Sequence, residues 1–268
     1  MIAYVAEISF AKGTSVLAVI VTSTSSPTAK SLSPVSSSIN GTTYTLKETE
    51  NLTGTTDASI TPAVKTNYTG FTAPSTQTTT IAGDGSTVIN YNYTRNKYYL
   101  DLNGYLDGVA GGNITDYGTA DVYVNGSKVA TGVGDFCSEL YYGSTYEIKN
   151  IVAISGHTYM GVHSGSLTGT TGASQTNVVL GFITNVSISS QPSDAVVKTG
   201  DSTSFKVVAS GYEPKYQWYV ASSSTGAGSL IDGATSATYT FTSAKAQNGK
   251  YYYCVISNNS GSSVESNR

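Results

Sequence analysis

Apolar and polar residues alternate with a period of two in several short runs of this chain. The clearest runs are residues 43–48, 87–93, 121–124 and 203–209. Because successive side chains of a strand point to opposite faces, such runs are typical of strands with one face buried. The stretches between them are rich in Gly, Asn, Ser, Thr and Pro, which favour turns. The pattern therefore predicts an all-β chain made of several small domains.

Two of the turns predict hairpins. Asn125-Gly126 interrupts the alternating run 121–130, and this dipeptide supplies the two positive φ angles of a type I′ turn. The Gly-rich loop 82–86 separates two further β-prone runs, and we expect those runs to pair as a second hairpin.

The last third of the chain, residues 185–268, has the marks of an immunoglobulin-like sandwich. Trp218 lies on one probable strand, and Tyr252 precedes Cys254 by two residues on another, as in a tyrosine corner. The position that would carry the partner cysteine is Val207, so we predict no disulfide and expect Cys254 to act as a small buried apolar residue. The final strand should begin or run at about Arg268, and we therefore expect a fragment of a longer protein.

Residues 41–97 resemble a repeat of bacterial surface proteins. The motifs that carry the resemblance lie in residues 47–56, 68–71 and 91–96. They are similar to the mucin-binding and internalin B-type repeats, which implies a β-grasp-like module, here a partial one. Residues 1–40 are interpreted as an N-terminal segment followed by a Ser/Thr/Pro-rich linker.

The apolar run 16–21 allows two interpretations. A buried strand is favoured, and the hydrophobic part of a signal peptide is the alternative. The negative charge of Glu7 argues against the signal peptide, because it would lie in the region that normally carries positive charge. The run is too short to span a membrane.

Residues 98–184 resemble a second class of module. The hairpin 121–130, the strand 145–151 and the segment 156–159 follow one another as in PEGA and carboxypeptidase-regulatory-like sandwiches. The resemblance implies a β-sandwich, with residues 178–183 as its closing strand.

The composition limits the classes of partner and the cellular location that can be expected. Charged residues make up 12% of the chain, against roughly 25% in average soluble proteins, and the net charge is −3. No cluster of Lys and Arg exists that could bind phosphates, so a nucleic-acid partner is unexpected. The chain has only two cysteines, Cys137 and Cys254, in different predicted domains. This composition suits a large secreted bacterial protein that folds without disulfides.

Few residues suggest a catalytic or metal-binding site. The segment 101–108 resembles a calcium loop, but Tyr105 and Gly112 stand where oxygen ligands are required, so a turn is favoured. His157 and His163 could share a sheet face, but two ligands do not make a metal site. No serine lies in a nucleophile elbow. We expect no catalytic residue, no metal and no cofactor. Lys–Asn isopeptide bonds occur in some surface stalks, but the sequence identifies no triad for one.

Neighbouring tyrosines are the one feature with binding potential. Tyr141 and Tyr142 are the candidates for contact with a ligand, because exposed aromatic rings stack on sugars or anchor protein interfaces. The alternative, which is favoured, is that they cover a sheet face.

The sequence thus predicts a non-enzymatic stalk or adhesin fragment at the bacterial cell surface, in the cell wall or secreted, with an extracellular protein or glycan as ligand. The alternative is a carbohydrate-binding accessory region of a large extracellular polysaccharide-degrading enzyme. A third interpretation, a receptor-like or inhibitor-like binding sandwich, rests on the immunoglobulin-like pattern alone.

Overall fold

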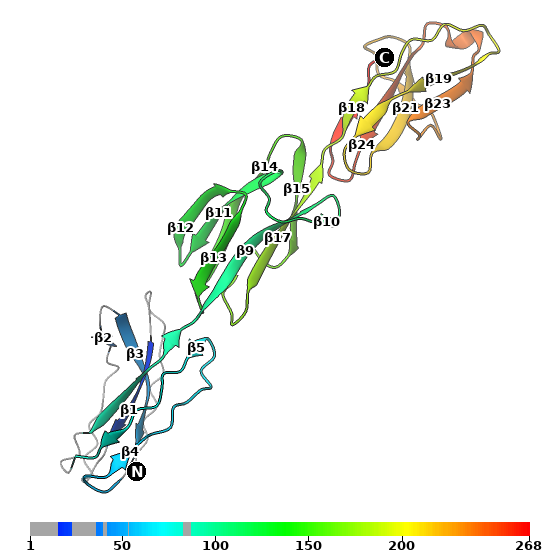
Figure 1. Cartoon of the computed structure of the whole chain (residues 1–268). Coiled ribbons are helices and arrows are strands. Elements are labelled where there is room, and N and C mark those ends of the chain that lie inside the picture. Colours follow the sequence, from blue (N-terminus) through cyan, green and yellow to red (C-terminus); the bar gives the residue numbers. More distant parts are fainter. Residues whose placement is uncertain (1–15, 23–35, 40–41, 53, 83–86) are drawn as a thin grey trace.

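The computed structural model describes residues 16–22, 36–39, 42–52, 54–82 and 87–268. Its regular structure is β-strand throughout, apart from one short 3₁₀ helix, η1 (Lys245–Gln247). Three hydrophobic cores follow one another along the chain, and the units around them lie in a row (Figure 1). We refer to them as the N-terminal, middle and C-terminal units. The prediction of an all-β chain of tandem small units is confirmed.

The N-terminal unit has one four-stranded sheet with the order β2-β3-β1-β7. Its strands are β1 (Val16–Thr22), β2 (Ser36–Ile39), β3 (Thr42–Asn51) and β7 (Val88–Asn92). Two short pairs accompany it: β4 (Ser59–Ile60) with β6 (Thr79–Thr80), and β5 (Phe71–Thr72) with β8 (Thr94–Arg95).

The interpretation of residues 1–40 needs a correction. β1 is parallel to β3 and antiparallel to β7, so it is an inner strand of the sheet. β2 pairs with β3. A boundary at residue 40 would therefore cut through one sheet. The apolar run 16–21 lies in the strand β1, as favoured, and residues 1–15, 23–35 and 40 lie outside the described residues.

The hairpin predicted around residues 82–86 is wrong. β6 pairs with β4 and β7 pairs with β1, so the two runs do not form a ladder with each other. Side chains connect this region instead: the Thr87 hydroxyl donates to the Thr80 carbonyl at 3.3 Å, and Nε2 of Gln77, just before the first run, donates to the Asn90 carbonyl at 2.9 Å. Most of the loop lies outside the described residues.

The period-two run of β7 does place one face inward. Ile89, Tyr91 and Tyr93 form the buried core of the N-terminal unit. Each tyrosine hydroxyl has a partner, because Tyr91 donates to the Pro62 carbonyl and Tyr93 to the Lys65 carbonyl, both at 2.7 Å. These bonds remove the cost of burying the hydroxyl groups.

The middle unit is a sandwich of two sheets over one core. Its strands are β9 (Lys97–Leu106), β10 (Val109–Ala110), β11 (Gly118–Val124), β12 (Ser127–Val133), β13 (Phe136–Tyr141), β14 (Thr145–Ala153), β15 (His157–Ser164), β16 (Thr168–Thr170) and β17 (Thr176–Thr184). One sheet has the order β10-β9-β17-β15, with β13 also on β9, and the other has β12-β11-β14-β16. Between β11 and β12, Asn125 and Gly126 have φ angles of 50° and 76°, as a type I′ turn requires.

The segment 101–108 is neither a turn nor a calcium loop over most of its length. Residues up to Leu106 belong to β9, which lies between β13 and β17. The turn is confined to Asp107 and Gly108, whose φ angles are 52° and 81°. Gly104 fits this strand because the hydroxyl of Tyr117 occupies the space that its Cβ would need.

The C-terminal unit has the strands β18 (Ser187–Ser190), β19 (Ser202–Lys206), β20 (Val208–Ser210), β21 (Lys215–Ala221), β22 (Ser229–Leu230), β23 (Thr238–Thr242), β24 (Tyr251–Ser257) and β25 (Ser263–Glu265). The largest sheet has the order β22-β21-β24-β25, and the pairs β18-β20 and β19-β23 complete the unit.

Trp218, Val207 and Cys254 meet in the core of this unit. The indole nitrogen of Trp218 donates to the Ser236 carbonyl at 2.9 Å. Both cysteines of the chain are free, and burial raises the pKa of the Cys254 thiol to about 11. Tyr252 stacks on Phe205 with the ring centroids 5.0 Å apart.

Candidate binding surfaces

Tyr142, one of the two predicted contact residues, lies where the N-terminal and middle units meet. Its ring covers Gly70 so closely that a Cβ at that position would overlap it, and Gly70 has a φ of 81°. The ring also makes edge contacts with Phe71 and Tyr98, at centroid distances of 6.3 and 6.4 Å. Tyr142 is therefore half-buried and contacts both units.

Tyr141 has different surroundings. The Arg95 guanidinium lies 5.7 Å and the Lys97 ammonium 5.2 Å from its ring centroid. Arg95 also donates from Nε to the Tyr142 carbonyl at 2.5 Å, and burial lowers the pKa of its guanidinium. The two tyrosines thus do not form one flat exposed platform.

A second junction joins the middle and C-terminal units at Thr184, the last residue of β17. Its amide and hydroxyl donate to the two carboxylate oxygens of Asp107, at 2.8 and 2.6 Å. Its carbonyl accepts from the backbone of Tyr212 at 3.1 Å and from the side-chain amide of Asn258 at 3.0 Å. Every polar group of Thr184 is bonded, and the four bonds reach both units.

A shallow groove of about 360 Å³ lies beside this junction. Its walls include Tyr105, His163 and Met160 of the middle unit and Tyr212 of the C-terminal unit. The rings of Tyr105 and His163 are stacked, with their centroids 3.5 Å apart and an interplanar angle of 8°. The groove offers aromatic edges and few polar groups, so it suits an apolar or sugar-like ligand better than an ion.

The histidines do not form a catalytic or metal site with one another. His163 stacks on Tyr105, while His157 lies beside Tyr117 with the ring centroids 6.2 Å apart. Nδ1 of His157 is buried and has no hydrogen-bond partner. Within the described ranges, no group of three His, Cys, Asp or Glu side chains is close enough to hold a metal ion.

Asp121 is the centre of a polar cluster on the outer face of β11. One carboxylate oxygen accepts from Lys128 Nζ and Asn150 Nδ2, both at 2.7 Å, and the other accepts from the Gly132 amide at 2.8 Å. The bond to Lys128, followed by those to Asn150 and Gly132, lowers the pKa of the carboxyl to about 2.

The structure thus brings a Lys, an Asp and an Asn together, as isopeptide formation requires. Lys128 and Asp121 form an ion pair in which the bond to Asp121 raises the pKa of the Lys128 amine. The cluster is therefore best described as an ion pair with an amide donor.

The sequence interpretation missed the residues of the second junction. Asp107-Gly108 is an Asp-Gly turn signal, and it could have located the turn between β9 and β10. Nothing local marks Thr184 or Asn258, because their partners are 77 and 74 residues away.

The comparisons with known proteins agree with the C-terminal assignment. Residues 187–258 match the family model of the immunoglobulin domain. No curated protein sequence matches the chain.

Similar solved structures include a chimeric titin Z1Z2 tandem, with 16% identity, a TM-score of 0.25, and coverage of 62% of this chain and 92% of that one. The IG1+IG2 segment of DIP-gamma has 10% identity and a TM-score of 0.28, covering 63% and 91%. Immunoglobulin domains 1–5 of Sidekick-1 have 10% identity and a TM-score of 0.26, covering 87% and 64%. Scores at this level support no further conclusion.

Among the described residues, no helix has the length and apolar character needed to cross a membrane.

Proposed function

We propose that this chain is part of the stalk of a bacterial cell-surface or secreted adhesin, where it spaces or presents binding modules outside the cell and performs no catalysis. The observation that carries the proposal is the pair of junctions. At the first junction, the hydrogen bond from Arg95 to the Tyr142 carbonyl and the ring contact of Tyr142 with Phe71 join neighbouring units. At the second, the Thr184 carbonyl accepts from Tyr212 and Asn258, and no long linker separates the units at either place. A row of units held in this way keeps its length, which is what a spacer requires (Figure 1).

Sequence features support the same proposal. A low content of charged residues and strands rich in Ser, Thr and Tyr accompany the resemblance to surface repeats. The immunoglobulin-like unit adds a fold that is common among extracellular binding modules. The ligand would be an extracellular protein or glycan.

Small-angle X-ray scattering on the full chain tests the spacer. We expect a single extended particle whose maximum dimension equals the length of the row of units in the structure. A matched variant with Gly-Ser-Gly inserted after Asn185 should show a broader distribution of dimensions, because the bonds of Thr184 to Tyr212 and Asn258 would be lost. A compact wild-type particle, or one as variable as the insertion variant, would reject the proposal.

The second candidate is a carbohydrate-binding accessory region, and the groove at Tyr105 and His163 favours it over the predicted pair of tyrosines. Aromatic rings beside a shallow groove can stack on sugar rings. Binding to an insoluble polysaccharide that is lost in Tyr105→Ala and kept in Tyr141→Ala would support this candidate. Its absence from a panel of polysaccharides would remove it.

A further inference from the structure

Two irregularities interrupt the pairing of β15 with β17 in the middle unit. The register passes over Met160, just before Gly161, and over His163, just before Ser164. A residue passed over in this way is a β-bulge, which re-aims its side chain and is common beside binding sites. Both side chains are exposed, so packing in the core does not explain the bulges.

The two bulges aim their side chains at one glycine. A Cβ atom at Gly181 would lie 3.9 Å from the Cβ atoms of both Met160 and His163. Gly181 is also the register partner of Tyr105 on β9, and the His163 ring stacks on the Tyr105 ring. The bulges and the missing side chain of Gly181 therefore build the groove beside the second junction.

The same face continues along β9, away from the groove. Leu100 and Leu102 belong to the core, so the residues that alternate with them face outward. These outward residues are Tyr99, Asp101, Asn103 and Tyr105. Tyr99 is 47% exposed. It lies six residues from Tyr105, about 20 Å at the rise of a strand.

The stretch between the two rings is mainly polar. On β17, Asn177 lies opposite Asp101, and Val179 lies opposite Asn103. Gln175 joins the polar groups across the strands, because its Nε2 donates to Asp101 Oδ2 at 3.2 Å and to Asn177 Oδ1 at 2.9 Å. The face thus has an aromatic ring at each end and amide and carboxylate groups in the middle.

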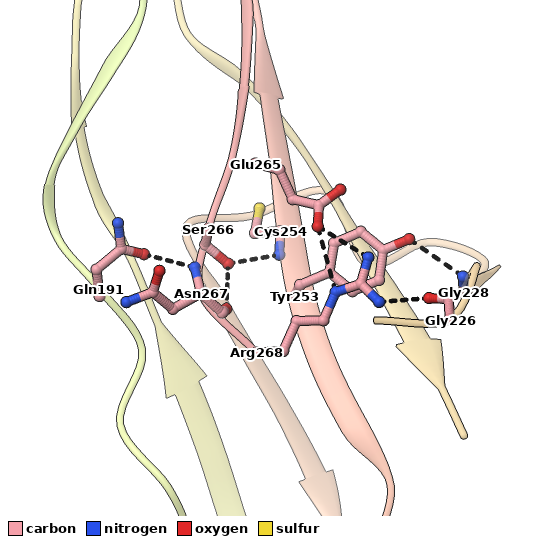
Figure 2. Close-up of polar contacts among 9 residues, drawn as sticks. All are labelled: Gln191, Gly226, Gly228, Tyr253, Cys254, Glu265, Ser266, Asn267 and Arg268. Atoms are coloured by element: carbon pink, nitrogen blue, oxygen red, sulfur yellow. Dashed lines mark hydrogen bonds and ion pairs between the residues drawn. The ribbon is translucent and has the colours of Figure 1, made fainter. Parts of the chain in front are cut away.

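Tyrosines also lie on the outer face of the largest sheet of the C-terminal unit, but there the chain covers them. Tyr253 stacks on Tyr219 with the ring centroids 5.2 Å apart, and the Arg268 guanidinium lies 4.0 Å from the Tyr253 centroid. The Gly228 amide donates to the Tyr253 hydroxyl at 3.3 Å, and Figure 2 shows these contacts of Tyr253 with Arg268 and Gly228. Tyr253 is only 6% exposed, so it is closed to a ligand, whereas Tyr99 is open to one.

We propose that the outer face of β9 and β17 binds a linear, neutral polysaccharide chain that runs along β9. One sugar ring would occupy the groove, and another would stack on Tyr99. The hydroxyl groups between them would bond to the side chains of Asp101, Asn103 and Asn177. The inference rests on the carbohydrate-binding candidate above and extends it from one groove to a site several sugar units long.

The layout of the face selects a glycan over a polypeptide. The backbone groups of β9 and β17 are used in ladders over most of their length, so an extended peptide cannot add to them as a further strand. Protein interfaces have an apolar centre and a polar rim, and this face has the opposite arrangement. Sugars present C–H groups that match the rings and hydroxyl groups that match the polar middle.

The charges of the face select a neutral glycan over an acidic one. The Lys97 ammonium already lies 4.0 Å from the Glu139 carboxylate, so that pair carries no net charge. The carboxylate of Asp101 lies in the middle of the face, where it would repel an acidic chain and can accept bonds from neutral hydroxyl groups.

Titration calorimetry on the full chain tests the length of the site. The probes are the disaccharides and hexasaccharides of cellulose, mannan and xylan. We expect saturable binding of at least one hexasaccharide. The matching disaccharide should bind about tenfold more weakly, because it cannot reach both rings.

Three substitutions of exposed side chains separate the two ends of the site. Tyr99→Ala should weaken hexasaccharide binding by about tenfold and leave disaccharide binding unchanged, since the disaccharide occupies the groove alone. His163→Ala should weaken both, because it removes one wall of the groove. Tyr251→Ala is the matched control, since this tyrosine is 37% exposed but lies on β24 of the C-terminal unit, and it should change neither.

The outcomes distinguish this inference from the candidate on which it rests. Equal affinities for disaccharide and hexasaccharide, or hexasaccharide binding that is insensitive to Tyr99→Ala, would overturn the long site and leave the groove as a carbohydrate site. Failure of every probe to bind the wild-type chain would reject both. Neither result bears on the spacer, which the scattering experiment tests separately.

Discussion

The two junctions between the units are built from different interactions. The first is built mainly around an aromatic ring: Tyr142 covers Gly70 and contacts Phe71 and Tyr98, and its carbonyl accepts one bond from Arg95. The second depends on directed hydrogen bonds, with all polar groups of Thr184 shared between Asp107, Tyr212 and Asn258. Apolar contact is not directional, whereas hydrogen bonds lose strength quickly when their angles change.

This difference implies a division of roles. The first junction should contribute more to stability, because the free energy gained by burying a large ring exceeds the net free energy of one hydrogen bond. The second should fix the rotation of the C-terminal unit about the long direction of the chain, because two directional bonds from Tyr212 and Asn258 meet at the Thr184 carbonyl, while Asp107 holds Thr184 in the middle unit. A stalk can use both: one contact resists separation and the other resists twisting.

The largest effect is expected from Tyr142→Ala. The ring is half-buried, so the loss should be about 2–3 kcal/mol of unfolding free energy, less than for a fully buried aromatic residue. Denaturant unfolding measures the stability, and small-angle scattering measures how widely the relative positions of the N-terminal and middle units are distributed.

Tyr141→Ala is the matched control for that variant. Its ring lies beside two cations, Arg95 of the N-terminal unit and Lys97 of its own unit, and such contacts are weak at an exposed site, so we expect a loss below about 1 kcal/mol. Equal losses in the two variants would show that the first junction does not depend on Tyr142.

The sequence predicted the local parts of this molecule well. The period-two run at Ile89, Tyr91 and Tyr93 gave the inward face of β7, because alternation in a strand is a backbone property. The prediction failed where tertiary packing overrides local preference. The polar, Gly-containing stretch of β9 has the composition of a turn, yet it is a strand that pairs with β13 and β17, and Gly104 leaves room for the Tyr117 hydroxyl.

The junctions could be predicted least. The sequence leaves Tyr142 as a candidate for ligand contact, with cover of a sheet face favoured, because a ring on a strand has no local mark that distinguishes an exposed face from a face covered by another unit. The bonds of Thr184 join residues more than seventy positions apart, and no periodicity records such pairs.

A smaller effect is expected from Thr184→Val, which keeps the shape of the side chain and removes its hydroxyl. One carboxylate oxygen of Asp107 loses its donor, so the cost should be about 1–2 kcal/mol. Scattering should show a small widening of the range of orientations of the C-terminal unit, because the hydroxyl bond to Asp107 helps to hold the residue whose carbonyl accepts the two bonds that cross the junction. Thr131→Val, at an exposed position of β12, is the control and should change neither quantity. If the two variants behave alike, the second junction does not depend on the hydroxyl.

The smallest effect is expected from acid, which acts on the middle unit apart from either junction. The pKa of Asp121 is lowered to about 2, so its ionised form is favoured by folding. The stabilisation is complete above the unfolded pKa of about 4 and disappears as the pH falls toward 2. This stabilisation should be modest, because the Lys128 side chain is 39% exposed and water screens the pair.

Thermal unfolding across this range should show a weaker pH dependence in Asp121→Asn than in wild type. The control Asp135→Asn, which removes an exposed carboxylate, should show no such change. Identical pH dependence in all three proteins would mean that the Asp121 cluster contributes nothing to the stability of the middle unit, and that its acid sensitivity must be sought elsewhere, including at the junctions.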